Sequence, residues 1–308
     1  MGKGAPGIGE SKGELVGVYD PGFPPLLREI PDPPLILHVR GNLDCLATPA
    51  VAVVGARRCT SQGRALAERF AKALGECGLT IVSGLALGID AHAHRGTLAG
   101  RGTTIACLGS GLDRIYPRSH ERLVQQIVSA GGLLLSEYSP EVSAKPFHFP
   151  ERNRIISGLC LGTLVVEASE KSGSLITARM ALEQGRDVFV LPGPVDSLVS
   201  GGCHRLIREG AELVVTPEQI IESLGLERRQ VSVSQIAPSS NVLSSNVLSS
   251  NVSREQRYLL ELCSGYARDL GELMALTGWD TTRLMRMLGE LELLGIVRQT
   301  TDGYIASS

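Results

Sequence analysis

Seven short runs rich in valine, leucine, isoleucine and threonine recur between residues 51 and 215, with longer amphipathic segments between them. The runs lie at 51–54, 80–82, 104–108, 133–135, 163–166, 188–191 and 213–215. The amphipathic segments lie at 62–77, 90–99, 119–129, 174–184, 202–209 and 217–224. Apolar runs without alternation are typical of strands buried on both faces, and strands that alternate with helices indicate a parallel sheet. The pattern predicts an α/β fold with a doubly wound, mostly parallel sheet over residues 51–225.

The segments on either side of this domain differ from it in amino-acid composition. Residues 1–50 are polar and then proline-rich, which predicts an N-terminal extension and a lead-in segment with one short strand at Leu35–Leu37. Residues 226–252 contain the repeat NVLSS, and its serine and asparagine content predicts a flexible linker.

Residues 253–308 regain regular periodicity. Three helices are predicted at 254–263, 270–277 and 281–294. The dipeptide Asp302-Gly303 between two short apolar runs indicates a hairpin. Three helices and a hairpin predict a small winged-helix domain. Its six basic and eight acidic residues differ from the basic face of a typical duplex reader, so a protein-contact role is equally open.

Composition narrows the classes of function. The 308 residues carry 30 basic and 32 acidic side chains, which excludes a polycationic nucleic-acid coat but allows a local basic groove. Aromatic residues make up only 4%, which favours an α/β core over a β-sandwich. Seven cysteines without a C-x-x-C pair are typical of a reducing cytosol. With no signal-peptide pattern and no run near the ~20 apolar residues of a membrane helix, we expect a cytoplasmic protein without membrane contact.

Small residues follow most of the predicted strands. They include Gly55, Gly84, Gly109, Ser172, Gly173 and Ser174. In an open parallel sheet these positions share one edge, where ligands bind and where backbone N–H groups at helix N-termini can hold anions. Three cations, Arg57, Arg58 and Lys171, belong to the same edge. The sequence therefore predicts a phosphate-binding crevice, with these N–H groups free to bind the phosphates.

A second candidate is the stretch 145–154, which we interpret as a loop leading into an apolar helix. It contains Lys145, Phe147, Phe149, Arg152, Asn153 and Arg154. Aromatic rings stack on unpaired bases and cations follow the phosphates, so this composition suits single-stranded nucleic acid. Core packing of both phenylalanines and ion pairing of the arginines explain the stretch equally well.

Other ligand motifs are absent from the sequence or weak in it. It has neither G-x-x-x-x-G-K-[ST] nor G-x-G-x-x-G, which argues against ATP hydrolysis and dinucleotide chemistry. Asp90, His92 and His94 have a metal-like spacing, but helix capping by Asp90 and packed or surface histidines are the favoured interpretation. No cofactor, metal or catalytic residue is predicted.

Longer motifs carry a family resemblance. The segments VGARRCTSQGR, SGLALGIDAHAHRG, FPERNRIISGL and GCHRLIREGA resemble the DNA-processing protein A (DprA/Smf) family, and the match extends from about Tyr19 to Leu224. The resemblance implies a Rossmann-like domain over 51–225 and a winged-helix domain over 253–308.

The resemblance also implies a function. Members of the family bind single-stranded DNA, protect it, and help to load RecA during natural transformation, as dimers and without covalent chemistry. The family's phosphate-contacting arginine falls on Arg57, its cationic and aromatic contacts fall in 145–154, and its pocket falls on the glycine- and serine-rich turns named above. We expect a dimer interface near Leu206–Leu224, although burial of these side chains against the sheet is an equal explanation.

The competing class of function is an enzyme. Gly162-Thr163 together with Glu167 is similar to nucleotide-processing relatives of this superfamily that hydrolyse the glycosidic bond of nucleoside monophosphates. In that alternative, Glu167 would assist the departure of the base.

Overall fold

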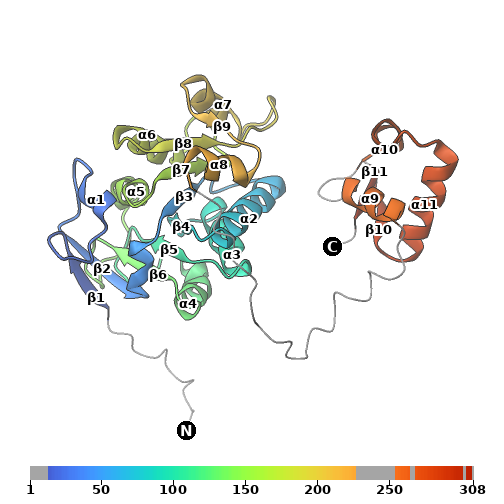
Figure 1. Ribbon diagram of the computed structural model, residues 1–308. Helices are drawn as coiled ribbons and strands as arrows, with labels where there is room; N and C mark the ends of the chain where they lie inside the picture. Colours follow the sequence, from blue (N-terminus) through green and yellow to red (C-terminus); the bar gives the residue numbers. More distant parts are fainter. Residues whose placement is uncertain (1–12, 227–253, 264–267, 301–302, 307–308) are drawn as a thin grey trace, which may run out of the picture. The chain divides into compact units, whose positions relative to one another are not determined.

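The computed structural model of the protein describes residues 13–226, 254–263, 268–300 and 303–306 (Figure 1). The chain divides into two compact units, Met1–Val231 and Ser232–Ser308, which are treated separately below. The predicted linker 226–252 lies outside the described residues except for Leu226.

A nine-stranded mixed sheet forms the centre of the first unit. Its strands are β1 (Glu14–Gly17), β2 (Ile36–Gly41), β3 (Ala50–Val54), β4 (Thr80–Ser83), β5 (Thr104–Cys107), β6 (Leu133–Ser136), β7 (Gly162–Val165), β8 (Asp187–Val190) and β9 (Glu212–Leu213). They are ordered β1-β2-β6-β5-β4-β3-β7-β8-β9, and the seven strands from β6 to β9 in this order pair in parallel. The predicted doubly wound, mostly parallel sheet is confirmed.

The lead-in segment extends this sheet at one edge. Strand β2 pairs antiparallel with β6, and β1 pairs antiparallel with β2. The short strand predicted at Leu35–Leu37 corresponds to β2, which begins one residue later and is longer. Strand β1 has only four residues, too few for a periodic signal to identify it from sequence.

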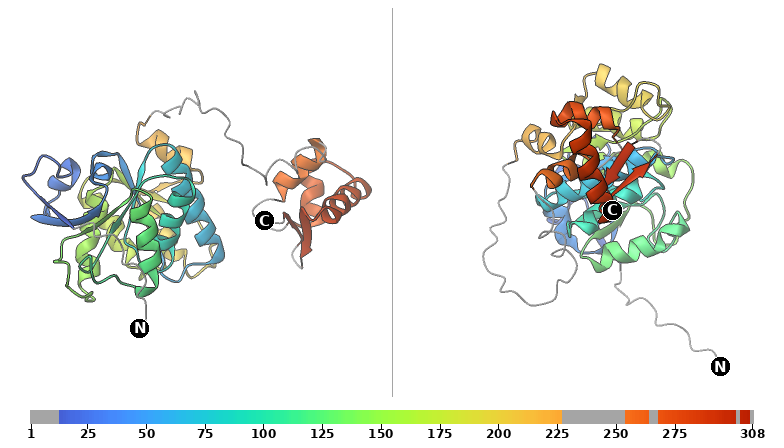
Figure 2. Two further views of the ribbon diagram at one scale, coloured as in Figure 1. Left: turned by 90° about the horizontal axis from the view of Figure 1, so that it is seen from below. Right: turned by 90° about the vertical axis from the view of Figure 1, so that its right-hand side faces the viewer.

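Helices cover both faces of the sheet (Figures 1 and 2). One face carries α2 (Ser61–Glu76), α3 (Ile89–Ala99), α4 (Glu121–Ser129) and α8 (Pro217–Ser223). The other carries α1 (Pro25–Arg28), α5 (His148–Gly158), α6 (Ser174–Glu183) and α7 (Gly201–Arg208). Strand β3 contributes side chains to the hydrophobic cores on both faces of the sheet. Ala50, Ala52 and Val54 pack on the face that carries α5, whereas Val51 and Val53 pack on the face that carries α2. Alternation of side chains along a strand explains this division.

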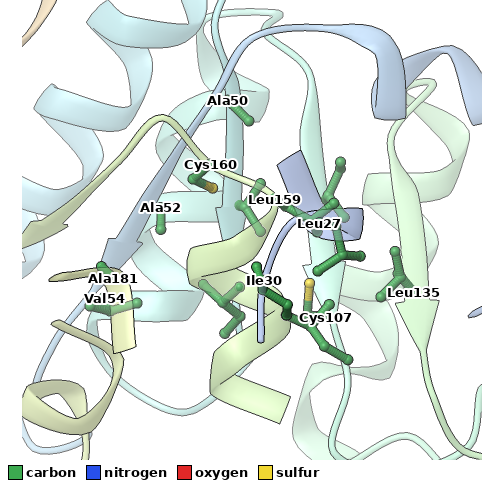
Figure 3. Close-up of a cluster of buried hydrophobic side chains, with 14 of the residues drawn as sticks. Leu27, Ile30, Ala50, Ala52, Val54, Cys107, Leu135, Leu159, Cys160 and Ala181 are labelled. Carbon is green, nitrogen blue, oxygen red and sulfur yellow. The ribbon is translucent and has the colours of Figure 1, made fainter. Parts of the chain in front are cut away.

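Helix α5 is held closely against the lead-in segment. Figure 3 shows Leu27 and Ile30 beside Leu159 in the core on this side of the sheet. A Cβ added to Gly158 would come within 2.9 Å of the side chains of both Leu27 and Ile30, so the helix and the lead-in segment make close backbone-to-side-chain contact.

The interpretation of residues 145–154 as a loop is wrong from His148 onward, because α5 begins there. Pro146 and Pro150 suggested a loop, yet proline is compatible with the first turn of a helix, where its missing N–H has no partner to lose. Phe149, Arg152 and Asn153 therefore project from the first turns of a rigid helix.

The second unit is a winged helix, as predicted. Helices α9 (Arg254–Leu262), α10 (Leu270–Thr277) and α11 (Thr281–Leu293) pack with the hairpin β10 (Val297–Thr300) and β11 (Gly303–Ala306) (Figure 2). The side chains of Asp269 and Asp280 cap α10 and α11. Leu284, Met287, Leu288 and Leu291 of α11 are buried, whereas Leu294 is exposed because it follows the last turn of the helix. None of the helices in the described residues is long and apolar enough to cross a bilayer.

Candidate nucleic-acid interface

A cavity of about 670 Å³ opens at the carboxyl ends of β3 and β7. The chain leaves β3 for β4 on one side, and later crosses through α5 to β7 on the other, so this is the topological switch point where doubly wound sheets bind ligands. The lining comes from the loop after β3, the first turns of α5 and the start of α6. It consists of Val54, Gly55, Ala56, Arg57, Arg58, Ala86, Asp90, Tyr116, Pro146, Phe149, Pro150, Arg152, Asn153, Ile156, Ser169, Ser172, Gly173, Ser174, Ile176, Thr177 and Val199.

An exposed arginine and two aromatic rings form one wall of the cavity. The Arg57 guanidinium carbon lies 5.2 Å from the centre of the Phe149 ring, within range of a cation–π interaction. The Tyr116 ring centre lies 5.5 Å from that of Phe149, and the two rings are tilted by 46°. Arg57 has no carboxylate at ion-pair distance within the described part of the chain. This wall offers a positive charge and apolar ring faces to a ligand.

Arg152 lies beneath this wall and is 4% exposed. Its Nη1 donates a hydrogen bond of 2.6 Å to the Gly84 carbonyl and a second one to the Cys107 carbonyl, which ties α5 to the ends of β4 and β5. Burial raises the pKa of the nearby Asp90 carboxyl, and the positive charge of Arg152 opposes that rise. Two of the three guanidinium nitrogens of Arg152 therefore cannot reach a ligand. Nη1 already donates to the two carbonyls, and Nε is buried away from the cavity surface, where it has no hydrogen-bond partner.

The N-terminus of α6 faces the cavity from the opposite side. Ser172, Gly173 and Ser174 precede or open the helix. Its first N–H groups are bonded locally, which corrects the prediction that they are free: the Ser174 N–H donates to the Ser172 hydroxyl at 3.4 Å, and the next two N–H groups donate to the Ser172 and Gly173 carbonyls at 3.1 Å. The hydroxyl oxygens of Ser172 and Ser174 lie 2.7 Å apart, and a Cβ on Gly173 would meet open space. Hydroxyls at the positive dipole end of a ten-residue helix suit an anion such as phosphate.

Backbone N–H groups in the turns before α2 and α3 are also bonded, which corrects the prediction of free N–H groups at these two turns. The Glu167 carboxylate accepts the Thr60 N–H at 2.9 Å, at the start of α2. The Asp90 carboxylate accepts the N–H groups of Gly84 and Ala86 at 3.1 and 3.3 Å, in the loop before α3. Only tertiary structure brings Glu167 to Thr60, so no local sequence pattern indicates that contact.

The family model of DNA recombination-mediator protein A matches residues 14–225 of this chain. The chain belongs to this family. A second model, the winged-helix domain of the same family, matches residues 246–303. The resemblance read from the sequence motifs is confirmed.

Relatives in the DNA recombination-mediator protein A family include the DNA processing protein DprA of Streptococcus pneumoniae, 49% identical over 66% of this chain and 72% of that protein. Protein Smf of Escherichia coli is 40% identical over 92% of this chain and 74% of its own length. The X-ray structure of the Streptococcus pneumoniae protein matches 69% of this chain and 74% of that chain with a TM-score of 0.65 and 48% identity. A structure of the Helicobacter pylori protein, described for its single-stranded DNA binding mode, matches 69% of this chain and 95% of that chain with a TM-score of 0.63 and 31% identity.

Nine of the predicted site residues line the cavity of this family member. They are Gly55, Arg57, Arg58, Phe149, Arg152, Asn153, Ser172, Gly173 and Ser174. Gly84 and Gly109 lie at the same edge but are covered by α5: a Cβ on Gly84 would meet the Arg152 guanidinium at 2.6 Å, and one on Gly109 would meet the Phe149 ring at 3.0 Å. These two glycines make room for side chains of the protein itself.

The remaining predicted residues lie outside the cavity lining. Phe147 is 55% exposed, and the Lys145 Nζ lies 5.7 Å from its ring centre. Lys171 is exposed beside the α6 turn. Arg154 is held in ion pairs, with Asp32 at 2.9 Å and Glu137 at 2.7 Å. For Arg154, the alternative interpretation therefore holds: it forms ion pairs within the protein and is not free to contact a DNA phosphate.

Tyr116 and Asp90 are among the lining residues that sequence reasoning did not assign to this site. Tyr116 follows the glycines after β5, where an exposed aromatic beside a predicted crevice was an available signal. The prediction that Asp90 caps a helix is wrong: Gly88 is the N-cap of α3, no side chain caps this helix, and the Asp90 carboxylate accepts N–H groups of the loop that precedes it. His92 contacts Glu68 and His94 contacts Thr104, and within the described residues no group of three or more metal-ligating side chains converges.

Proposed function

We propose that this chain binds single-stranded DNA in the cavity between α5 and α6, and acts as a recombination mediator. The observation that carries the proposal is the exposed Arg57 over the Phe149 ring, which faces the serine hydroxyls at the start of α6 across the same cavity. Ring faces stack on unpaired bases, while the arginine and the helix N-terminus bind phosphates. The single-stranded DNA binding mode described for the Helicobacter pylori relative supports it.

The charge and size of the cavity agree with this ligand. Its charged lining residues are Arg57, Arg58 and Arg152 against the single acid Asp90, although the chain as a whole carries −2. Cavities of about 300–1,000 Å³ accommodate ligands of small-molecule size. A short stretch of flexible strand fits such a space, whereas a stiff duplex would have to bind outside it.

A salt titration tests the proposal. Binding to oligo-dT and to a blunt duplex of equal length is measured over a range of salt concentrations. We expect tighter binding to the single strand, with a log–log slope of about −0.7 for each phosphate neutralised. Equal or tighter binding to the duplex contradicts the proposed function.

We further propose that the protein is a dimer, joined near the β9 edge. The six apolar residues expected at this interface are Leu206, Ile207, Leu213, Ile220, Ile221 and Leu224. Of these, Leu206, Ile220 and Ile221 are buried within the protein, which agrees with the alternative of burial against the sheet. Leu213 on β9 is 46% exposed and Val215 is 49% exposed, so these two remain available for a partner copy. Light scattering of Leu213→Glu beside the unmodified protein tests this interface, and an unchanged mass excludes Leu213 from it.

The mediator role extends to RecA in the cytoplasm, as the family resemblance implies. Two linked cavities raise the effective concentration of the second, so a dimer should hold long strands much more tightly than short ones. RecA filament assembly is timed on strands coated with a single-strand-binding protein, with and without this protein. Acceleration supports the mediator role, and its absence leaves only a DNA binder.

The glycosidic-bond hydrolase alternative gains no support from the site. Glu167, its required acid, lies outside the cavity lining and accepts hydrogen bonds from the Thr60 backbone N–H and hydroxyl. We therefore propose that the protein acts without covalent chemistry. Release of free base from nucleoside monophosphates would contradict this.

A further inference from the structure

Glu167 follows β7, yet its carboxylate lies at the start of a different element, α2. Its Oε2 accepts the Thr60 N–H at 2.9 Å, and its Oε1 accepts the Thr60 hydroxyl at 2.5 Å. The Thr60 hydroxyl oxygen accepts the Gly63 N–H at 2.9 Å. A Cβ on Gly63 would collide with the carboxylate, so the anion lies directly against the first turn of the helix.

The β3–α2 turn is the position at which doubly wound folds commonly bind a ligand phosphate, on the N–H groups and positive dipole end of the first helix. Helix α2 has no acidic residue in its own first turn. The negative charge that stabilises this end comes from Glu167, from across the β3–β7 strand pair. The carboxylate thus occupies the position that a phosphate would take.

Glu167 also holds both ends of the loop that carries Arg57 and Arg58. Its carbonyl oxygen accepts the Ala56 N–H at 2.7 Å, just before the two arginines. Its carboxylate accepts the Thr60 N–H just after them. Both arginines are exposed and line the cavity, so the backbone at each end of the loop, together with the contact of Arg57 with the Phe149 ring, determines where they lie.

We propose that Glu167 is a positioning residue for DNA binding, whose carboxylate fills the phosphate position of α2 and fixes the loop that presents Arg57. The inference rests on the proposed function for its effect on DNA. It explains which phosphates the cavity accepts: those of a strand lie toward Arg57 and the serine hydroxyls at the start of α6, and the N-terminus of α2 is closed to a nucleotide phosphate.

A double-mutant cycle between Glu167 and Arg57 tests the positioning role. Removing an acid beside a DNA site ordinarily strengthens binding, but we expect Glu167→Ala to weaken binding to oligo-dT about tenfold, the scale of one charge-assisted contact. Because Glu167 acts through Arg57, Arg57→Ala should add little in the Glu167→Ala background. Fully additive losses, or binding that strengthens, overturn the positioning role.

Glu170→Ala is the matched control, because Glu170 is an exposed acid in the same loop after β7, and its removal changes the net charge equally. We expect unchanged or slightly tighter DNA binding from it. A loss equal to that of Glu167→Ala would overturn the proposal. Should Glu167→Ala not fold, Glu167→Gln, which keeps the shape without the charge, takes its place in the cycle.

A second measurement needs no DNA. Inorganic phosphate is added to each variant and the thermal transition is followed. The vacated position in Glu167→Ala should give a larger phosphate-dependent rise in Tm than the unmodified protein, Glu170→Ala or Glu167→Gln shows. The absence of this excess overturns the phosphate-position assignment. If the protein binds no single strands, the proposed function fails, and the phosphate measurement still decides the role of Glu167 at α2.

Discussion

The Arg57 guanidinium lies 5.2 Å from the centre of the Phe149 ring, so the loop after β3 and the first turn of α5 meet at the cavity. The pairing does two things. It holds a flexible cation over an apolar ring, and it leaves the rest of the guanidinium to bind a phosphate. Each half of the pair can be tested separately.

Replacement of Arg57 by alanine should weaken binding to oligo-dT by ten- to a hundredfold, because a charge-assisted hydrogen bond contributes about 1.5–3 kcal/mol. The side chain is exposed, so the thermal transition should be unchanged. Fluorescence anisotropy and thermal melting measure the two quantities. Arg69→Ala is the matched control, since Arg69 is another exposed arginine over a phenylalanine ring, that of Phe70 on α2. Unchanged binding in Arg57→Ala would remove Arg57 from the site.

The two phenylalanines of the 145–154 stretch should differ in their effect on binding. Phe149 lines the cavity, whereas Phe147 does not. Loss of base stacking by alanine substitution costs about 1–3 kcal/mol per base, so Phe149→Ala should weaken oligo-dT binding by about five- to a hundredfold. Phe147→Ala should stay within about twofold of the unmodified protein. The same anisotropy titration compares the variants, and a larger loss from Phe147→Ala would reverse the assignment.

Arg152 should act on stability. Arg152→Met leaves the carbonyls of Gly84 and Cys107 without their donor, and removes the cation that faces the buried Asp90. Removing one partner of a buried charge pair costs about 3–5 kcal/mol, and urea denaturation should show a loss of this size in the free energy of unfolding. Arg154→Met breaks more exposed ion pairs and should cost about 1 kcal/mol or less. Equal losses would mean that Arg152 has no special role in fixing α5.

His94 should make stability depend on pH. Its Nδ1 donates to the Thr104 hydroxyl, which itself donates to the Ile81 carbonyl, so a second proton would have to bind at Nε2, which is buried without a partner. Burial, with His120 and Arg152 nearby, lowers the pKa of His94 to about 3. Between pH 6.5 and about 3 the unfolded chain binds a proton there and the folded chain does not. Stability from this group is therefore fully present above pH 6.5 and falls with pH, by about 1.4 kcal/mol per unit.

The comparison with His94→Asn isolates this effect, because asparagine can still donate to Thr104 but does not titrate. The difference in the free energy of unfolding between the unmodified protein and the variant, from urea denaturation, should shrink as the pH falls from 7 to 4. Parallel curves across this range would show that His94 titrates with the same pKa in the folded and unfolded states.

The sequence predicted those features whose signal is local. Apolar runs identified six of the seven parallel strands, since a strand buried on both faces is apolar throughout. The seventh, β9, is an exposed edge strand of two residues that shares only Leu213 with the predicted run 213–215. The roles of Arg57, Arg152 and Arg154 could not be separated from sequence, because three arginines in a polar context look alike. Their burial and partners, which depend on how α5 meets the sheet, distinguish them. The contact of Glu167 with Thr60 spans 107 residues and has no local signal.

A chain that ends at Val231 should still fold and bind single strands. The compact unit Met1–Val231 contains the whole cavity, and the core of the winged helix is built only from residues after 253. Residues 253–308 carry six basic and eight acidic side chains, which argues against their being the main DNA site. The truncated chain should keep its thermal transition and most of its affinity for oligo-dT, while RecA loading can depend on the missing unit. If the truncated chain keeps its thermal transition but loses single-strand binding, the DNA site extends beyond the cavity. The winged helix would then contribute to DNA binding despite its net acidity.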